Sequence, residues 1–355
     1  MRRLALSVLL AAIALGCGNH GSDRYSRKQA QKSLSKLEVP GTTVGEFKVT
    51  KVTDGDTVHV DGLDSSLRLV GIDTEETFKT EPDRRDYEAG WEQYLVKKRG
   101  ASKRPVKMST PFGDTAKKFA VKFFDGVDRV RLERDHPAEI RDRYKRYLAY
   151  VIAHKDGKWI NYNVEAVRAG MTPYFTKYGY SRKYHSDFLA AQHEAQKARR
   201  GIWGDADQHY PDYPERLAWW NARGEFVEEF RKEGEGKDNY IDITHWDAQK
   251  RIEELLGKEI HVLGTIDGAE IGQKGPSRAE MKGSKSFEFP LIFFDNDVFG
   301  TSGVREWKGE YVVVTGVPTV YENKRTHRKQ VQIRVERASQ IKLSKVPGLT
   351  PPTVP

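Results

Sequence analysis

The feature that most constrains the fold is an alternation of polar and apolar residues that begins near residue 46. Residues 46–52 alternate as the residues of a half-buried strand do. Asp54-Gly55-Asp56 is a turn signal, and residues 57–60 resume the alternation, so the two segments predict a β-hairpin. Residues 63–71 predict a third strand, in which Arg68 points to the face opposite its two leucine neighbours.

Helices and further strands follow this hairpin region. Apolar residues at helical spacing predict helices at 114–124, 161–169 and 186–199. Strands are predicted at 128–132 and 147–154. Residues 77–108 are charged and weakly patterned, so an insertion or a long loop is expected there.

A second strand-rich region follows a Pro- and Tyr-rich boundary at 210–213. Helices are predicted at 217–232 and 244–256. Strands are predicted at 259–265, 289–294, 310–317 and 330–335, with turns at Asp267-Gly268 and Glu322-Asn323. The proline-rich end of the chain is expected to be disordered.

The N-terminus has the pattern of a targeting segment. Arg2 and Arg3 precede the apolar run 4–15, which is short for a transmembrane helix. The run ends next to Cys17, with a small residue before it, and resembles a bacterial lipoprotein lipobox. An ordinary secretory signal with an incidental cysteine is the alternative. Cys17 is the only cysteine of the sequence, so no intrachain disulfide can form.

The charge balance favours polyanionic partners without defining any chemistry. The sequence has 60 Lys and Arg against 51 Asp and Glu, a formal net charge of +9. Such a balance suits nucleic acid or an anionic membrane, although many basic proteins are merely soluble.

Five residues have the chemistry that phosphodiester cleavage needs. Asp56 and Asp73 offer hard oxygen ligands of the kind that calcium or magnesium takes, and no Cys or His at zinc spacing accompanies them. Glu76 is suited to holding or deprotonating a water. Arg68 and Arg146 are suited to forked hydrogen bonds with phosphate oxygens. Each residue alone is equally explained by a plain turn, a solvated strand position or a basic surface.

The order of these residues resembles the staphylococcal nuclease (thermonuclease) family over roughly residues 47–203. The motifs that carry the resemblance are Val-Thr-Asp-Gly-Asp-Thr (52–57), Leu-Arg-Leu-Val-Gly-Ile-Asp-Thr-Glu-Glu (67–76), Phe-Gly-Asp-Thr-Ala (112–116), Asp-Arg-Tyr-Lys-Arg-Tyr-Leu-Ala-Tyr (142–150) and Gly-Ile-Trp (201–203).

The resemblance implies a mainly β fold with α-helices: a five-stranded OB-fold barrel with three helices. It implies calcium-dependent hydrolysis of DNA and RNA. The implied metal ligands are Asp56, Asp73 and the backbone carbonyl of Thr74. Arg68, Glu76 and Arg146 are implied to be catalytic, and Arg143, Tyr144 and Tyr178 to bind substrate.

The sequence departs from the family pattern at several places. Glu75 replaces the usual proline and is expected to add an acid near the metal. Lys145 replaces a glycine, which costs about 1 kcal/mol if that turn needs a positive φ. Strict spacing puts Thr176 where the family has a second tyrosine, so Tyr174 substitutes for it or the contact is lost. The insertion at 77–108 is either a lid over the site or a plain loop.

The second region resembles, more weakly, bacterial OB-fold barrels that bind nucleic acid. A glycine at or near the end of two of its strands suits the curvature of a barrel. Phe293, Tyr321 and Arg325 are candidates for stacking on bases or gripping phosphates. A core aromatic and a solvated hairpin explain them equally well.

We therefore predict an envelope-anchored, calcium-dependent nuclease for DNA or RNA, with an accessory OB-like barrel. The predicted division is a signal peptide (1–16), a lipidated tether (17–43), a nuclease-like domain (44–204, insertion 77–108), a helical linker (205–247), an OB-like domain (248–345) and a disordered tail (346–355). A monomer is expected, bound to the bacterial cell envelope only through the lipid on Cys17, on its periplasmic or outer surface. The alternatives are a catalytically impaired nucleic-acid-binding lipoprotein and a structural lipoprotein that binds anionic lipid or polysaccharide.

Overall fold

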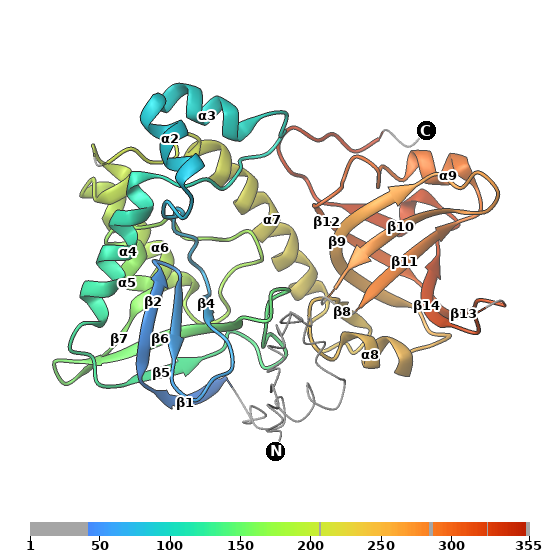
Figure 1. Cartoon of the computed structure of the whole chain (residues 1–355). Coiled ribbons are helices and arrows are strands. Elements are labelled where there is room, and N and C mark those ends of the chain that lie inside the picture. Colours follow the sequence, from blue (N-terminus) through green and yellow to red (C-terminus); the bar gives the residue numbers. More distant parts are fainter. Residues whose placement is uncertain (1–41, 206, 284–286, 325, 353–355) are drawn as a thin grey trace, which may run out of the picture. The chain divides into compact units, whose positions relative to one another are not determined.

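The computed structural model describes residues 42–205, 207–283, 287–324 and 326–352 (Figure 1). Residues Pro40–Pro355 form one compact unit. The predicted signal peptide and Cys17 lie outside the described residues. Among the described helices, none combines the length and apolar character that a membrane span requires.

The first sheet has seven strands in the order β1-β5-β6-β4-β3-β2, with β7 paired to β6. They are β1 (Thr43–Phe47), β2 (Val49–Asp54), β3 (Thr57–Val60), β4 (Leu67–Leu69), β5 (Val130–Glu133), β6 (Tyr147–Lys155) and β7 (Lys158–Asn161). β2 and β3 form the predicted hairpin, and β4 runs parallel to β6. β1 and β2 are the two end strands of this order, although only Lys48 separates them in the sequence. Within the described residues, hydrogen bonds do not close the ladder into a complete barrel.

Three predicted helices accompany the first sheet: α4 (Pro111–Phe124), α5 (Tyr162–Arg168) and α6 (His185–Lys197). α4 contacts β2, α5 contacts β6, and α6 packs on α5 (Figure 1). Thr110 caps α4 by accepting a hydrogen bond from the Gly113 N–H, and Pro111 follows at the first helical position. These local signals explain why sequence periodicity located the helix.

The insertion contains helices, contrary to the expectation of a long loop. They are α2 (Glu81–Ala89) and α3 (Trp91–Arg99). Its aromatic residues pack with one another and with buried Tyr210 and Tyr213. α2 buries no residue fully and α3 only Tyr94, so neither has the broad apolar stripe by which a helix is recognised in a sequence.

The second sheet has eight strands in the order β13-β14-β11-β10-β9-β12-β15, with β8 paired to β9. They are β8 (Tyr240–Asp242), β9 (Ile260–Glu270), β10 (Ser277–Lys282), β11 (Glu288–Phe293), β12 (Tyr311–Gly316), β13 (Pro318–Glu322), β14 (Lys329–Arg334) and β15 (Ile341–Leu343). Helices α8 (Ala248–Glu254) and α9 (Asn296–Thr301) accompany them. The predicted class, two β-rich regions with helices, is confirmed.

Several details of the second region differ from the prediction. Asp267-Gly268 is not a turn, because β9 continues through it to Glu270. Phe293 is a core residue with no exposed surface, so it cannot stack on a base. Tyr321 is 51% exposed, and Arg325 lies outside the described residues. Val346 is 2% exposed, so the chain is still packed where the disordered tail was expected to begin.

The long helix α7 (Tyr213–Glu233) contacts β12 of the second sheet. Trp219 and Arg223 of α7 both donate to the carboxylate of Glu310, which immediately precedes β12. Arg104 of the insertion forms an ion pair with the same carboxylate at 2.9 Å. Glu310 therefore joins three segments that are far apart in the sequence.

Candidate functional site

The turn between β2 and β3 holds Asp54 and Asp56 in place. The buried Tyr162 hydroxyl donates to the Gly55 carbonyl at 2.7 Å, and Thr57 Oγ1 donates to Asp56 Oδ1 at 2.8 Å. A Cβ at Gly55 would lie 2.7 Å from the Thr74 side chain, so glycine lets the turn approach Thr74 closely. The turn therefore lies against the segment that carries Asp73.

Arg68 links the two aspartates. In β4 it lies opposite Thr57 of β3, and its guanidinium forms ion pairs with Asp56 and Asp73. Burial alone lowers the pKa of Arg68, but the two carboxylates raise it overall, so the guanidinium stays charged. Burial alone raises the pKa of Asp73, but Lys107 and Arg68 lower it overall.

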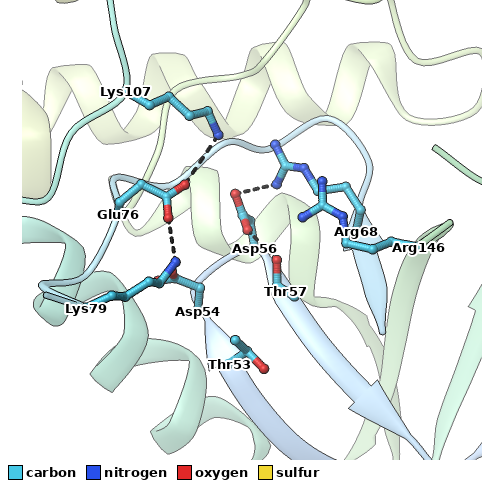
Figure 2. A pocket seen from close by; sticks show the side chains of 9 residues that line it. All are labelled: Thr53, Asp54, Asp56, Thr57, Arg68, Glu76, Lys79, Lys107 and Arg146. Atoms are coloured by element: carbon cyan, nitrogen blue, oxygen red, sulfur yellow. Dashed lines mark hydrogen bonds and ion pairs between the residues drawn. The ribbon is translucent and has the colours of Figure 1, made fainter. Parts of the chain in front are cut away.

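Glu76 lies between two lysines that sequence reasoning did not identify (Figure 2). Lys79 Nζ is 2.6 Å from Glu76 Oε2 and 3.1 Å from Asp54 Oδ2. Lys107 Nζ is 2.5 Å from Asp73 Oδ1 and 3.6 Å from Glu76 Oε1. Although burial raises the pKa of Glu76, the two lysines lower it overall, so this carboxyl is ionised at neutral pH. The spacing of three residues between Glu76 and Lys79 is a weak indication in the sequence that the two side chains meet. Nothing in the sequence indicates that Lys107 reaches Asp73.

Arg146 reaches the same place from the turn before β6. Asp142 accepts hydrogen bonds from the Arg146 backbone at 2.9 Å and from its Nε at 2.8 Å, which orients the guanidinium. Lys145 has φ 68°, so this turn does use the left-handed conformation expected at the position of the family glycine. The parallel pairing of β4 with β6 brings the turn next to Arg68.

These side chains line one cavity of about 160 Å³. Figure 2 shows Arg68 and Arg146 side by side, with Glu76 and its two lysines across from them. The lining residues are Thr53, Asp54, Asp56, Thr57, Arg68, Glu76, Lys79, Lys107 and Arg146. Glu76 is held close to α4, because a Cβ at Gly113 would lie only 2.1 Å from the Glu76 carbonyl oxygen. The structure thus brings the three predicted catalytic residues and Asp56 together in one cavity. Asp73 is joined to them through Arg68, which forms ion pairs with both aspartates.

The predicted substrate-binding residues do not line this cavity. Tyr144 lies beside Arg146, which lines it, and Tyr178 lies beside Phe175, which contacts Arg68. Tyr144 is 63% exposed, receives a hydrogen bond from Arg143 at 2.7 Å, and has its ring 5.5 Å from the Arg146 guanidinium. Tyr178 is 60% exposed and packs edge-on against Phe175, whose ring lies 5.8 Å from the Arg68 guanidinium.

The second family tyrosine has no replacement here. Tyr174 is buried, stacks on Phe188, and accepts a hydrogen bond from the Ser181 N–H. Thr176 is also buried, and its hydroxyl bonds Asn221. Of the two alternatives left by the sequence, the structure favours loss of the contact, because neither side chain reaches solvent.

Glu75 does not add an acid to the cavity, contrary to expectation. One carboxylate oxygen accepts hydrogen bonds from the Tyr210 N–H and the Tyr213 hydroxyl, both at 2.8 Å. The other accepts a hydrogen bond from Thr110. Burial raises the pKa of Glu75 above its ordinary value. The residue therefore fastens the start of α7 to the first sheet region rather than binding a metal.

The donor set at the cavity fits a hard divalent cation. Asp56 and Asp73 are 5% and 6% exposed, and carboxylate and carbonyl oxygens are the ligands that calcium prefers. Thr74 next to them is 2% exposed, and its hydroxyl has no hydrogen-bond partner among the described residues. Lys107 neutralises Asp73 in the present arrangement, so its ammonium and a cation would compete for the same oxygen.

Comparisons with known proteins agree with this geometry. Residues 66–205 match the model of the staphylococcal nuclease homologue family. Asp54 and Asp56 precede that match, and the structure places Asp56 beside Arg68 and Asp54 in the same cavity. The chain is 30% identical over 208 residues to the thermonuclease of Staphylococcus intermedius, covering 57% of this chain and 99% of the relative.

Two further relatives are similar to this chain over more than 160 residues each. The thermonuclease of Staphylococcus hyicus is 32% identical over 162 residues, which is 45% of this chain and 76% of the relative. An uncharacterised protein of Methanocaldococcus jannaschii is 35% identical over 164 residues, 44% of this chain and 70% of the relative. With arginines and carboxylates of this chain gathered in one cavity, these matches support a nuclease-like function. The chain belongs to the staphylococcal nuclease family.

Proposed function

We propose that this protein is a calcium-dependent nuclease that hydrolyses phosphodiester bonds of DNA, RNA or both. The observation that carries the proposal is one cavity lined by Arg68, Arg146, Asp56 and Glu76. Two guanidinium groups side by side suit the added negative charge of a pentacoordinate phosphate. An ionised carboxylate across from them suits a water that attacks in line.

Each residue has a distinct role in this proposal. Arg68 and Arg146 bind phosphate oxygens, with Asp142 holding Arg146 in its orientation. Glu76 holds or deprotonates the attacking water. Asp56, Asp73 and the Thr74 carbonyl are the proposed calcium ligands, and the ion would supply charge neutralisation at the phosphate. We also propose that the flanking nucleotides contact Arg143, Tyr144 and Tyr178. Both tyrosines expose most of their surface, Tyr144 next to Arg146 and Tyr178 next to Phe175.

The cellular setting is also part of the proposal. The lipobox-like sequence at Cys17 supports an anchor in the bacterial envelope by lipid alone, and a monomer is part of the proposal. The predicted boundaries at 204 and 248 would separate a nuclease domain from an accessory nucleic-acid-binding domain. Exposed Tyr321 supports that accessory role, since base stacking needs an accessible aromatic face.

The central test is cleavage of DNA and RNA by the full-length chain, in calcium and in EDTA. We expect cleavage only with calcium, and a loss of about 10²-fold or more in Arg146→Ala. Arg129→Ala is a matched control, since Arg129 is an exposed arginine of the same sheet region that does not line the cavity. Equal cleavage by both variants, or cleavage that EDTA leaves unchanged, would contradict the proposal.

A second candidate is a nucleic-acid-binding protein with impaired catalysis. The observation that favours it is the pair of ammonium groups on Asp73 and Glu76, which oppose a metal ion at the same carboxylates. This candidate predicts retention of DNA on a filter without calcium-dependent cutting.

Removing the Lys107 charge separates the two candidates. Lys107→Met is expected to tighten calcium binding about tenfold, equivalent to about 1.4 kcal/mol, because no ammonium then competes for Asp73. The expected gain is modest because the Lys107 side chain is 48% exposed and its charge is screened by solvent. Calorimetric titration with calcium measures the change directly.

Lys97→Met provides the control for this measurement. Lys97 lies in the same insertion and pairs with Asp86, away from the cavity, so its replacement should leave calcium affinity unchanged. If Lys107→Met binds calcium no more tightly than the wild type, Lys107 does not compete with the metal. If it binds more tightly and still does not cleave, the impaired binding protein is the better description.

A further inference from the structure

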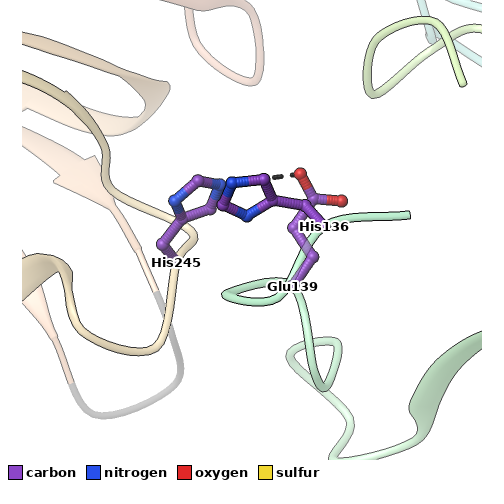
Figure 3. A group of neighbouring side chains, drawn as sticks. All are labelled: His136, Glu139 and His245. Atoms are coloured by element: carbon purple, nitrogen blue, oxygen red, sulfur yellow. Dashed lines mark ion pairs between the residues drawn. The ribbon is translucent and has the colours of Figure 1, made fainter. Parts of the chain in front are cut away.

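A second cluster of ligating side chains lies outside the nuclease cavity. His136 and Glu139 belong to the segment between β5 and β6, and His245 to the segment between β8 and α8. One ligand atom from each of the three lies within 4.8 Å of the others (Figure 3). None of the three lines the cavity of Arg68 and Glu76.

His245 is buried without the hydrogen bonds that a buried imidazole needs. Its side chain is 7% exposed, and neither ring nitrogen has a hydrogen-bond partner among the described residues. Its Nε2 is 3.5 Å from Glu139 Oε1 and 3.9 Å from Asp242 Oδ2, distances too long for a good hydrogen bond. Buried polar atoms left in this way call for an ion or a water.

Polar atoms around the cluster also lack hydrogen-bond partners. The buried Arg231 Nε and Asp247 Oδ1 also have no hydrogen-bond partner in the described part of the chain. Arg231 approaches Glu139 only to 3.6 Å, and donates instead to the Tyr180 carbonyl at 2.8 Å. Burial alone raises the pKa of Glu139, but His245 and Arg231 lower it overall, so the carboxylate is ionised and can bind a cation.

We propose that His136, Glu139 and His245 bind a divalent transition-metal ion of the zinc class. Two imidazoles and one carboxylate are typical ligands of such ions, whereas calcium takes six to eight oxygens. Asp242 Oδ2 lies 3.9 Å from His245 Nε2, so a small movement of this carboxylate, or a water, would supply a fourth ligand.

Binding requires a defined local rearrangement. The two imidazole rings are nearly parallel, 18° apart with centroids separated by 4.7 Å, so one ring must turn before both address the same ion. His136 Nδ1 now accepts a hydrogen bond from the Ala138 N–H at 3.1 Å, and this bond would be exchanged for a metal bond. Both segments are connections outside the helices and strands, where such a turn is feasible.

The ion would fasten the connection before β6 to the connection between β8 and α8. A single weak backbone bond already joins them, from the Trp246 N–H to the Ala138 carbonyl at 3.3 Å. A ligand that binds only the folded state raises its stability, so zinc should raise the temperature of unfolding.

The test is titration of the chelator-treated full-length chain with Zn²⁺ and with Co²⁺. We expect one ion per chain, a Co²⁺ visible absorption typical of four-coordination, and a higher unfolding temperature with Zn²⁺. His245→Gln and Glu139→Gln should each weaken binding by about tenfold or more. His154→Gln is the matched control, because His154 lies 3.7 Å from Asp128 in a histidine–carboxylate pair outside the cluster.

A further variant keeps this site apart from the nuclease cavity. Asp73→Asn should lose calcium binding and keep Zn²⁺ binding. The zinc titration therefore tests this cluster even if the proposed calcium site is wrong. Absence of Zn²⁺ binding in the wild type, or equal binding in His245→Gln and Glu139→Gln, would overturn the proposal. Either result would mean that the cluster does not bind the ion.

Discussion

Replacing Arg68 by alanine is expected to lower the rate of nucleic-acid cleavage by about 10³-fold at saturating calcium. Its guanidinium lines the cavity with Arg146 and is aligned by Asp56 and Asp73. Removal of one preorganised donor to a developing oxyanion costs about 10²–10³ in rate, and a charged bidentate donor belongs at the upper end. Single-turnover cleavage of a short DNA substrate measures the effect.

The same variant should be stabilised by calcium more strongly than the wild type is. Without Arg68, Asp56 and Asp73 lose a cation that both share, so the metal-free protein is destabilised by repulsion between two buried carboxylates. Calcium would relieve that repulsion, and we expect the variant to gain more thermal stability from calcium than the wild type does. Arg68→Lys should recover stability better than rate, because lysine cannot form the fork. A rate within about tenfold of wild type would contradict the proposed role of Arg68.

Replacing Glu310 by alanine is expected to destabilise the protein by about 3–5 kcal/mol. The carboxylate is buried and accepts from Trp219 Nε1 at 2.9 Å and from Arg223, whose side chain is 1% exposed. Arg104 of the insertion forms a third contact. The substitution leaves a buried guanidinium without its counterion, which is the costly way to break a buried ion pair. Urea unfolding followed by tryptophan fluorescence measures the loss.

Two variants show whether the loss comes from the charge. Glu310→Gln keeps an acceptor for Trp219 and should destabilise less than alanine does. Glu306→Ala, at an exposed glutamate four residues earlier, should change stability by less than about 0.5 kcal/mol. A loss below about 1 kcal/mol in Glu310→Ala would show that Glu310 does not hold α7 against the second sheet.

Much of the fold was predictable because its signals are local. The alternation around Asp54-Gly55-Asp56 identified the hairpin, and Thr110 and Pro111 mark the start of α4. Arg68, Asp73 and Glu76 lie within nine residues, on one strand and the loop that follows it, so secondary structure alone nearly brings them together. The placement of Arg146 next to them needed only the parallel pairing of β4 and β6.

Other residues were placed wrongly or missed because their partners are distant in the sequence. Glu75 looked like a metal-site acid, but Tyr210 and Tyr213 bind it instead. The sequence left open whether Tyr174 replaces a substrate-binding tyrosine of the family, and the structure packs it on Phe188 in the core. The helices of the insertion, each with at most one fully buried residue, gave no clear periodicity.

By itself, the sequence determined the β2–β3 hairpin, the strands β5 and β6, the helices α4, α5 and α6, the family, and the acids and arginines with the right chemistry. Only the tertiary structure decided that Lys107 reaches Asp73, that Glu310 joins α7 to the second sheet, and that His136 meets His245. The physical reason is the range of the interactions. Hydrogen-bonded periodicity and capping act over a few residues, whereas the partner of a buried charge or imidazole is set by which segments pack together.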